Sequence, residues 1–347
     1  MKPIKVLLTA CGCPGASTLI RMLRQNGERE LRIVGVDMDP EAIGRFLADD
    51  FYTVPPVAEQ EAYLERMLAL VRQERPDVLF PESSLEVPVL ARHTGEIETL
   101  GARVLISSPQ SIDLANDKYQ MYQALRQKTD IPLPAYCWPK NLEEFIRQAH
   151  ELGYPERPVC FKPHVGKGSR GFRIIDPAVS RRDQLLDQKP NSRYMSLAEF
   201  QTIFEDDPHF PRLMLMEYLP EAETTTDSLC LEGQELLTAV KSVEQARWGV
   251  IVRGELLHRP DLVGYTRAIL QIIRLSYCVN LQFRGQKLIE INPRVSSFIY
   301  QPDLILPYLA IKLALDEITP QEIQARQADI AIGRRMIRYM DQVFWQQ

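Results

Sequence analysis

Polar and apolar residues alternate through the segment 280–292, which reads NLQFRGQKLIEIN. The alternation continues on both sides of a glycine and predicts a β-hairpin with the three-residue loop Gly285–Lys287. In that register, Gln282 lies directly opposite Glu290. Because side chains alternate between the two faces of a strand, Gln282, Glu290 and Asn292 then share one face. We therefore predict that three oxygen-bearing side chains converge on this hairpin.

Such a set of oxygen atoms suits a hard divalent cation. Mg²⁺ usually takes one or two protein carboxylates and leaves its other positions to water and to substrate phosphates. Mn²⁺ accepts similar ligands and could substitute for it. A solvated polar face is the commoner meaning of this alternation, and the hairpin alone does not exclude it. The metal prediction therefore depends on the tail Pro293-Arg294 and on features upstream.

A second candidate is the segment 162–171, KPHVGKGSRG, which gathers three glycines, a serine and three cationic side chains. Glycines let backbone N–H groups crowd around phosphate oxygens, and Lys or Arg neutralises the charge. The spacing is not that of a Walker A loop, because Lys162 precedes the glycines. A flexible hairpin is the alternative, but flexibility alone does not call for so much positive charge. We predict a phosphate-binding loop.

The elements around these segments fall into two classes. In the first third of the chain, short apolar runs alternate with helical patterns, which predicts βαβ units and an open parallel α/β domain over residues 1–112. Beyond residue 212, strands joined by short turns predict mainly antiparallel pairing. We therefore expect an α/β domain followed by an α+β region over residues 113–347.

Composition excludes several classes of function. The chain has 347 residues and a formal net charge of −5, so no basic surface for nucleic acid is expected. No run of about 18 apolar residues offers a transmembrane helix. The six scattered cysteines predict reduced thiols in a cytoplasmic protein rather than zinc ligands or disulfides. A homo-oligomer is compatible with the sequence. The apolar run Met336–Trp345 indicates docking onto the core or onto a partner subunit, and of the two we expect the core.

The order of these motifs resembles the ATP-grasp superfamily, in particular the branch similar to the carbamoyl phosphate synthetase large subunit. The resemblance covers most of the chain, and its strength lies in the order and approximate spacing of six motifs that are weak singly. They are Asn116-Asp117-Lys118, Phe161-Lys162-Pro163 with the loop to Gly171, Met216–Pro220, Glu223–Asp227, Leu281-Gln282 and Glu290–Ser296. The resemblance implies that the region after the α/β domain has two lobes, 113–212 and 213–347.

For the phosphates of ATP, the resemblance implies contacts from two lysines and a glycine-rich lid. Lys118 and Lys162 would be the lysines. Gly166, Gly168 and Ser169 would belong to the lid over the β- and γ-phosphates. A closing lid would also protect a reactive acyl phosphate from water.

For the nucleoside, the resemblance implies a linker and one carboxylate. Glu217 and the backbone of Tyr218 and Leu219 would read the adenine, and Glu223 would hold the ribose hydroxyls.

For the metal and the reacting end, the resemblance implies that Gln282, Glu290 and Asn292 hold Mg²⁺. Arg294 would lie beside the transferred phosphoryl group. Lys241, at a position where relatives commonly have Arg, is a second candidate cation for phosphate or substrate.

The implied reaction is that of an ATP-dependent ligase. A carboxylate would be activated as an acyl phosphate and attacked by an amine or another nucleophile, with release of ADP and phosphate. The substrates would be small molecules. An ATP-grasp phosphotransferase and a nucleotide-binding regulator without turnover remain alternatives. The chain departs from the synthetase in having one set of motifs rather than two. It also departs in the bulky residues 297–300, SFIY, on the substrate side.

Overall fold

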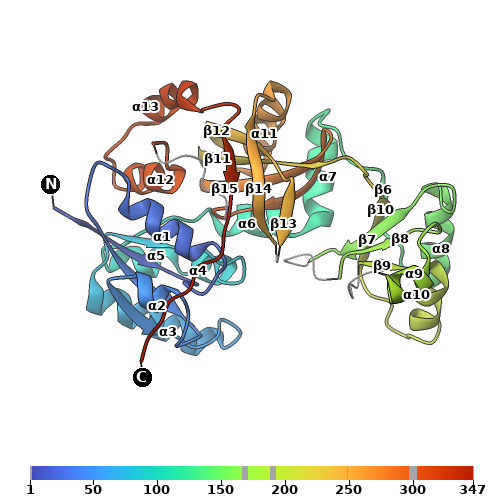
Figure 1. The fold of residues 1–347 in the computed structure, drawn as a ribbon, viewed down its shortest axis with the longest axis horizontal. Coiled ribbons are helices and arrows are strands. Elements are labelled where there is room, and N and C mark those ends of the chain that lie inside the picture. The colour runs from blue at the N-terminus through green and yellow to red at the C-terminus, as the bar shows by residue number, and fades with distance from the viewer. Residues whose placement is uncertain (1, 166–170, 188–192, 248, 297–302, 347) are drawn as a thin grey trace. The chain divides into compact units, whose positions relative to one another are not determined.

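The computed structural model describes residues 2–165, 171–187, 193–247, 249–296 and 303–346 (Figure 1). The chain forms two compact units. One contains residues 1–115, 222–286 and 290–347, and the other contains residues 116–221 and 287–289. The division into residues 1–112, 113–212 and 213–347 stays a prediction.

The first unit begins with a five-stranded, wholly parallel sheet, as the sequence predicted. The strand order is β3-β2-β1-β4-β5, with bounds β1 Ile4–Leu8, β2 Leu31–Asp37, β3 Asp50–Thr53, β4 Val78–Phe80 and β5 Arg103–Val104. The short strand β3 was not predicted. Its residues are half-buried or exposed, so its sequence lacks the apolar run that marks the inner strands.

Helices cover both faces of this parallel sheet. Val6 and Leu8 of β1 belong to the same core as Leu19 and Leu23 of α1 (Ala16–Arg24), whereas Leu7 belongs to the core that contains α3 (Gln60–Glu74). Burial on both faces explains why the strands read as continuous apolar runs. The remaining helices here are α2 Gly44–Leu47, α4 Val87–Arg92, α5 Thr94–Thr99 and α6 Pro109–Asn116.

The same unit contains a seven-stranded sheet in the order β13-β14-β12-β11-β15-β16, with β17 paired to β14. The pairs β11–β12, β11–β15, β12–β14, β13–β14 and β14–β17 are antiparallel. Helix α11 (Pro260–Ile273) covers one face, where the hydroxyls of Thr226 and Thr266 are 2.9 Å apart. The strand bounds are β11 Glu223–Leu231, β12 Gln234–Ser242, β13 Gln245–Arg247, β14 Val250–Leu257, β15 Tyr277–Arg284, β16 Lys287–Asn292 and β17 Arg335–Ile337.

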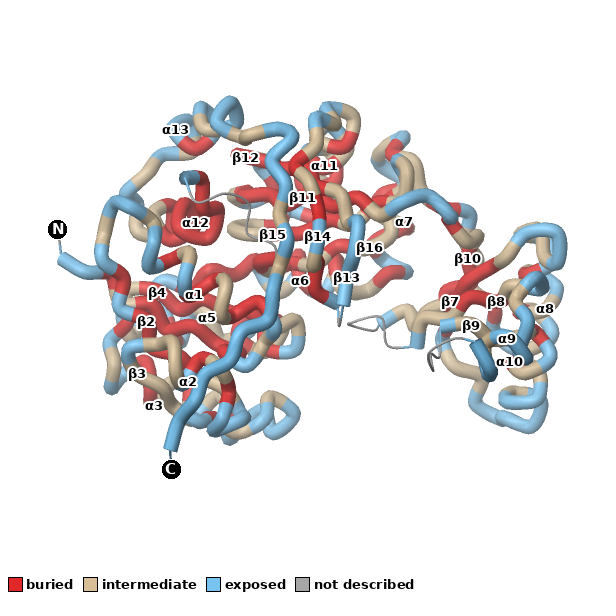
Figure 2. Tube along the Cα trace, in the orientation of Figure 1, coloured by how far each residue is buried: buried red, intermediate tan, exposed pale blue. Residues whose placement is uncertain are grey.

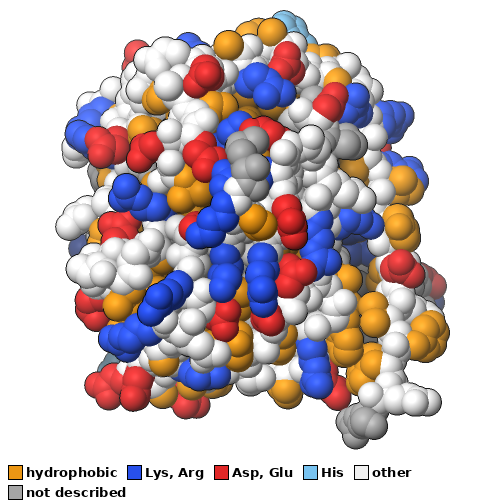
Figure 3. Space-filling view, turned by 90° about the vertical axis from the view of Figure 1, so that its left-hand side faces the viewer, with side chains coloured by type: hydrophobic (Ala, Val, Ile, Leu, Met, Phe, Trp, Pro, Cys, Tyr) orange, Lys and Arg blue, Asp and Glu red, His pale blue; other side chains and the backbone are white. Residues whose placement is uncertain are grey.

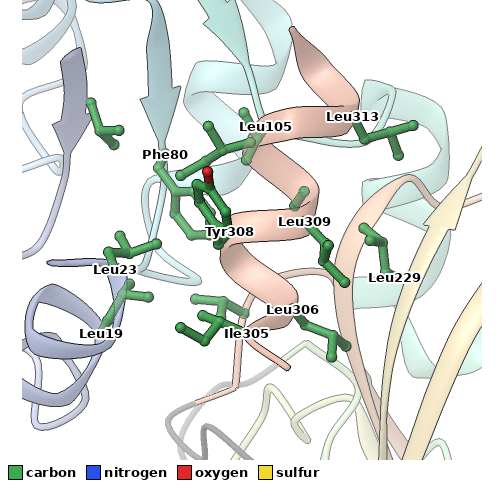
Figure 4. Close-up of a cluster of buried hydrophobic side chains, with 14 of the residues drawn as sticks. Leu19, Leu23, Phe80, Leu105, Leu229, Ile305, Leu306, Tyr308, Leu309 and Leu313 are labelled. Atoms are coloured by element: carbon green, nitrogen blue, oxygen red, sulfur yellow. The ribbon is translucent and has the colours of Figure 1, made fainter. Parts of the chain in front are cut away.

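Helix α12 (Leu306–Ala314) lies between the two sheets of the first unit. Its side chains meet Phe80 at the end of β4 on one side and Leu229 of β11 on the other (Figure 4). Eight of its nine residues are buried, and Figure 2 shows the burial along its length. A helix that is apolar all round is stable only inside a protein. It therefore joins the two sheets into one unit. The helices α13 Pro320–Ala325 and η1 Arg326–Asp329 follow it.

The second unit has its own five-stranded sheet, in the order β6-β10-β7-β8-β9. The sheet is antiparallel except between β8 and β9. Its core is aromatic, with the rings of Phe145 and Phe200 stacked at 3.9 Å. The elements are α7 Lys118–Lys128, β6 Tyr136–Cys137, α8 Leu142–Glu151, β7 Val159–Pro163, β8 Arg173–Ile175, α9 Arg181–Leu186, β9 Tyr194–Met195, α10 Leu197–Phe204 and β10 Leu213–Glu217.

Two sequence-based expectations were wrong in detail. The hairpin turn comprises only Gly285 and Gln286, because Lys287 already belongs to β16. Gly285 has φ +59°, which suits a tight turn. Most of the C-terminal run does not pack into the core, although Met336 packs against it. Phe344 is 88% exposed, and the half-exposed Trp345 packs against Phe46, with ring centroids 4.7 Å apart.

Charged side chains of both signs are interspersed on the face of the molecule that Figure 3 shows. Within the described ranges, the helices are all too short or too polar to cross a bilayer.

Truncating α12 tests its role in the first unit. We expect Leu309→Ala to lower the free energy of unfolding by about 2–5 kcal/mol, because truncating this buried side chain leaves a cavity between the two sheets. Denaturant unfolding measures the change. The control is Leu185→Ala, at a leucine that is 81% exposed, where the change should stay below about 0.5 kcal/mol. Equal effects of the two substitutions would contradict the role of α12.

Candidate functional site

A polar face crosses the middle of the seven-stranded sheet. Thr225 of β11 lies directly opposite Lys241 of β12 on one side and Gln282 of β15 on the other. Two residues further along β11, Asp227 lies opposite Asn280 of β15. Paired residues share a face, as do residues two apart on a strand. These five side chains therefore project from the face opposite α11.

A buried ion pair anchors this face. The ammonium group of Lys241 contacts the carboxylate of Asp227, and both side chains are almost inaccessible to solvent. Lys241 also donates to Oγ of Ser296 at 3.0 Å, and Asp227 accepts from Nδ2 of Asn280 at 2.7 Å. Burial lowers the pKa of Lys241 to about 8, although the neighbouring Asp227 opposes the shift. The ion pair thus fixes the positions of the side chains of Ser296 and Asn280.

The predicted metal ligands adjoin this network. Nδ2 of Asn292 donates to Oδ1 of Asn280 at 3.2 Å, a contact that agrees with the predicted register because these residues then face each other. Gln282 and Glu290 are half-buried. Beside Gln282, Oγ1 of Thr225 is buried and has no hydrogen-bond partner within the described residues. The oxygen donors and a single carboxylate fit a Mg²⁺ ion that completes its shell with phosphate and water.

Arg294 extends the site towards the parallel sheet. Its backbone N–H donates to the carbonyl of Asn292 at 2.8 Å, which closes a turn directly after β16. Its guanidinium donates to Oγ of Ser84 at 2.7 Å and to the carbonyl of Val295 at 2.7 Å. The cation is therefore fixed beside the loop that follows β4.

Glu223, the predicted ribose ligand, occupies the first position of β11 on the same polar face as Thr225. It lies opposite Arg284 of β15, and the two form an ion pair at 3.6 Å. Both side chains are partly accessible, so the carboxylate is oriented but not sealed off.

The second unit brings together the two predicted phosphate lysines. Lys162 lies on β7, and its ammonium donates to the carbonyl of Ile289 at 2.8 Å. Ile289 immediately precedes Glu290 in the chain. Lys118, 5% exposed, begins α7, and its backbone N–H donates to the carbonyl of His164 at 3.2 Å. Lys162 and the backbone of Lys118 at the start of α7 therefore lie near the same end of β7.

The predicted adenine linker follows β10. The carboxylate of Glu217 accepts from the backbone of Ala135 at 2.8 Å and from the ammonium of Lys287 at 2.5 Å. Leu219 is buried, and the backbone N–H of Tyr218 donates to the carbonyl of Pro158 at 3.4 Å. The side chain of Glu217 therefore connects the residues around β6 and β16, and the role of this linker in reading adenine stays a prediction.

Comparisons with known proteins bear on both units. A protein-family model described as "ATP-grasp in the biosynthetic pathway with Ter operon" matches residues 209–335, and one described as "PylC-like, N-terminal domain" matches residues 6–105. The carbamoyl phosphate synthase large chain of Clostridium acetobutylicum is 21% identical over 303 residues, which cover 83% of this chain and 26% of that protein. This chain spans about a quarter of the length of that relative.

Solved structures show the same fold. The biotin carboxylase of Campylobacter jejuni, in a complex with an ATP analogue, matches with a TM-score of 0.65 and 17% identity, over 96% of this chain and 74% of that chain. The N5-carboxyaminoimidazole synthetase of Staphylococcus aureus matches with a TM-score of 0.63 and 15% identity, over 92% of this chain and 80% of that one.

This chain is an ATP-grasp superfamily protein with a PylC-like N-terminal domain. The predicted fold is thereby confirmed: a parallel α/β sheet followed by the mixed and antiparallel sheets typical of ATP-grasp proteins. The roles of individual site residues stay predictions.

Part of the predicted ATP-grasp lid lies outside the described residues, namely Gly166, Gly168 and Ser169. Gly171, the last residue of the predicted lid, is described and has φ +76°. A Cβ atom there would lie 2.6 Å from Cγ of Pro163, so the position requires glycine.

An acidic cluster that was not predicted from the sequence lies at the carboxyl edge of the parallel sheet in this ATP-grasp protein. Glu82 follows β4, Glu86 accepts from Oγ1 of Thr9 at 2.6 Å, and Asp37, at the end of β2, accepts from the N–H of Gly12 at 2.6 Å. Burial raises the pKa of Glu82 to about 8 and that of Glu86 to about 7. The position of these residues after predicted strands could have revealed them, because open α/β sheets bind ligands beyond the carboxyl ends of their strands.

The raised pKa of Glu82 predicts a pH-dependent stability. The folded protein keeps this proton to about pH 8, whereas an unfolded carboxyl loses it near its ordinary value of 4.5. Stability should therefore fall as the pH rises between these values, by at most about 1.4 kcal/mol per pH unit. The Glu82→Gln variant lacks this pH-dependent contribution to stability, because glutamine has no carboxyl group to titrate.

Denaturant unfolding at pH 5, 6, 7 and 8 measures the difference between wild type and Glu82→Gln. The free energy of unfolding of Glu82→Gln should increase relative to that of the wild type as the pH rises. Glu65→Gln, at an exposed glutamate, should show no such relative increase. A difference that is constant across this range would refute the prediction.

Proposed function

We propose that this protein is an ATP-dependent ligase that activates a carboxylate as an acyl phosphate. An amine or another nucleophile then attacks the acyl carbon, and ADP and phosphate are released. The observation that carries the proposal is the polar face of the seven-stranded sheet. There, a buried Lys241–Asp227 pair fixes Asn280 and, through it, Asn292 among the oxygen donors. Preorganised groups of this kind are what phosphoryl transfer requires of a protein.

In this proposal Gln282, Glu290 and Asn292 hold the metal. When bound, Mg²⁺ would neutralise charge on the phosphate oxygens. Arg294 would face the transferred phosphoryl group, since Ser84 and the carbonyl of Val295 hold its guanidinium in place.

Other residues that the resemblance implicates would hold the rest of the nucleotide. Lys118 and Lys162 would contact the phosphates together with the lid glycines, and the backbone at Tyr218 and Leu219 would read the adenine. Glu223 would accept from the ribose hydroxyls. Lys241 is fully buried, so its role would be to orient Ser296 and Asp227 and not to meet solvent-exposed substrate.

Two further observations support the proposal. The names of the structurally similar proteins are those of a carboxylase and a synthetase, and the first was solved with an ATP analogue. The six cysteines are free, which supports a cytoplasmic location.

The test is incubation of the full chain with Mg-ATP and a panel of carboxylic acids, each with and without amines, with ADP release as the readout. Mass spectrometry identifies the product. A condensed product that requires both substrates supports a ligase. A stable phosphorylated product formed without a nucleophile indicates a phosphotransferase. Nucleotide binding without ADP release for any pair indicates a regulator, and either of the last two outcomes overturns the proposal.

Removing the single metal carboxylate should stop turnover. We expect Glu290→Ala to lower ADP production by about 100-fold or more, because a preorganised charge at the reacting phosphates is lost. Since Glu290 is half-buried, the fold should survive, as circular dichroism can check. Glu65→Ala is the control at an exposed carboxylate. Turnover like that of the wild type in Glu290→Ala would rule out the metal assignment.

Removing the β7 lysine should weaken nucleotide binding. We expect Lys162→Ala to raise the Kd for Mg-ATP by about tenfold or more, as the loss of a charge-assisted hydrogen bond would. Isothermal titration calorimetry measures it. Lys140→Ala, at an exposed lysine of the same unit, should bind as the wild type does. An unchanged Kd in Lys162→Ala would remove this lysine from the phosphate site.

A further inference from the structure

Glu82 is a buried carboxylate with one oxygen left unsatisfied. The residue is 7% exposed, and its Oε2 is buried with no hydrogen-bond partner within the described residues. An unpaired buried carboxylate oxygen is costly unless a ligand or a proton completes it. Once Glu82 is ionised, this atom therefore marks a place where a donor is missing.

The neighbouring acids do not share this deficit. Glu86 accepts from the hydroxyl of Thr9 at 2.6 Å, and Asp37 accepts from the backbone of Gly12 at 2.6 Å and of Asp39 at 2.9 Å. These bonds shape the loops that follow β1 and β2. Among these three acids, Glu82 is the one with a buried carboxylate oxygen that has no hydrogen-bond partner within the described residues.

The charges around Glu82 favour a cation. Glu86 and Asp37 act on it from the acidic side, and the guanidinium groups of Arg294 and Arg338 act from the other. With Glu82 and Glu86 both ionised, three carboxylates interact with two guanidinium groups, which leaves one negative charge to be balanced.

Both guanidinium groups are held by other partners. Arg294 donates to Ser84, and Arg338 donates to Oγ1 of Thr18 at 2.8 Å and to the carbonyl of Ile251 at 3.4 Å. The missing donor at Glu82 must therefore come from elsewhere.

The position of Glu82 is that of a ligand site. In the strand order β3-β2-β1-β4-β5, the chain runs outward from β1 to β3 and then returns to the other side of β1 with β4. Thr9 follows β1 and Glu82 follows β4, so both lie at this reversal of strand order. Open α/β sheets bind ligands in the crevice at such a point. Arg294, two residues after the predicted metal ligand Asn292, lies beside the same loop.

We propose that Glu82, with Glu86 and Asp37 around it, binds the ammonium group of a primary-amine substrate, which makes the nucleophile of the ligase an amine. The proposal rests on the proposed function for what the amine does next, but the binding itself does not need ATP. Burial raises the pKa of the empty Glu82 carboxyl, and a bound ammonium would offset that cost by pairing with the ionised form.

The experiment measures amine binding to the full chain without nucleotide. The probes are methylammonium, glycinamide and 1,4-diaminobutane, with 1,4-butanediol as the uncharged counterpart of the diamine, at constant ionic strength. Calorimetry or the shift in Tm reports binding. We expect saturable binding of at least one amine and none of the diol. Glu82→Gln should weaken that binding by about tenfold or more. Glu65→Gln, at an exposed glutamate of the same domain, should match the wild type.

A second variant protects the test against simple misfolding of the first. Arg338→Gln removes a cation that competes with the ligand, so it should tighten amine binding, on the order of threefold. A purely structural role of Glu82 does not predict that gain. Equal amine affinity in wild type and Glu82→Gln, or no saturable amine binding by the wild type, overturns the proposal.

Mg-ATP binding separates this proposal from the proposed function. Glu82→Gln should bind Mg-ATP as tightly as the wild type, because Glu82 is not among the nucleotide residues. Amine binding that disappears in this variant while the wild type fails to bind Mg-ATP would support the amine site and contradict the ligase. Normal Mg-ATP binding with no amine binding would do the reverse.

Discussion

The first unit depends on the burial of α12. Its Tyr308 and Leu309 are almost inaccessible, and its Ala310 and Ile311 are fully so. A helix with apolar residues on every side has no face to offer to water, so both sheets must close over it. This packing places the end of β4 and the polar face of β11 in one rigid core. The arrangement of the candidate site within this unit follows from a hydrophobic requirement.

The buried ion pair between Lys241 and Asp227 contributes little to the stability of the fold by itself. Removing Lys241 and Asp227 from water costs several kcal/mol per ion, and their attraction only roughly offsets that cost. The pair makes physical sense as a positioning device. Asp227 accepts from Asn280, which in turn accepts from Asn292, so the position of one predicted metal ligand is set three strands away from Lys241.

The carboxyl edge of the parallel sheet supplies the complementary chemistry. Arg294 follows β16 and is held by Ser84, which follows β4, so the seven-stranded sheet and the parallel sheet meet at one guanidinium group. On the side of the parallel sheet, Glu82 and Glu86 are buried acids. An ATP-dependent ligase must hold a phosphoryl group and a nucleophile close together. Within one unit, cationic and acidic groups stand next to each other in the way this reaction needs.

The sequence alone determined the parts of this protein that depend on local pattern. Apolar runs at β1, β2 and β4 predicted the parallel sheet, and the alternation around Gly285 predicted the hairpin. The order of the motifs indicated the ATP-grasp superfamily. The half-exposed β3 was missed, because a strand with neither an apolar run nor a clear alternation has no local signal.

Only the tertiary structure decided which distant residues meet. Lys241 and Asp227 are paired because β11 and β12 are neighbours in one particular register, and a shift by one residue would send one of them to the opposite face. Glu82 became a candidate through its burial and through guanidinium groups more than 200 residues away in the chain. The periodicity of a segment fixes which side chains share its face. Which faces then come together is decided by the packing of the whole chain, because no single segment carries the energy of that contact.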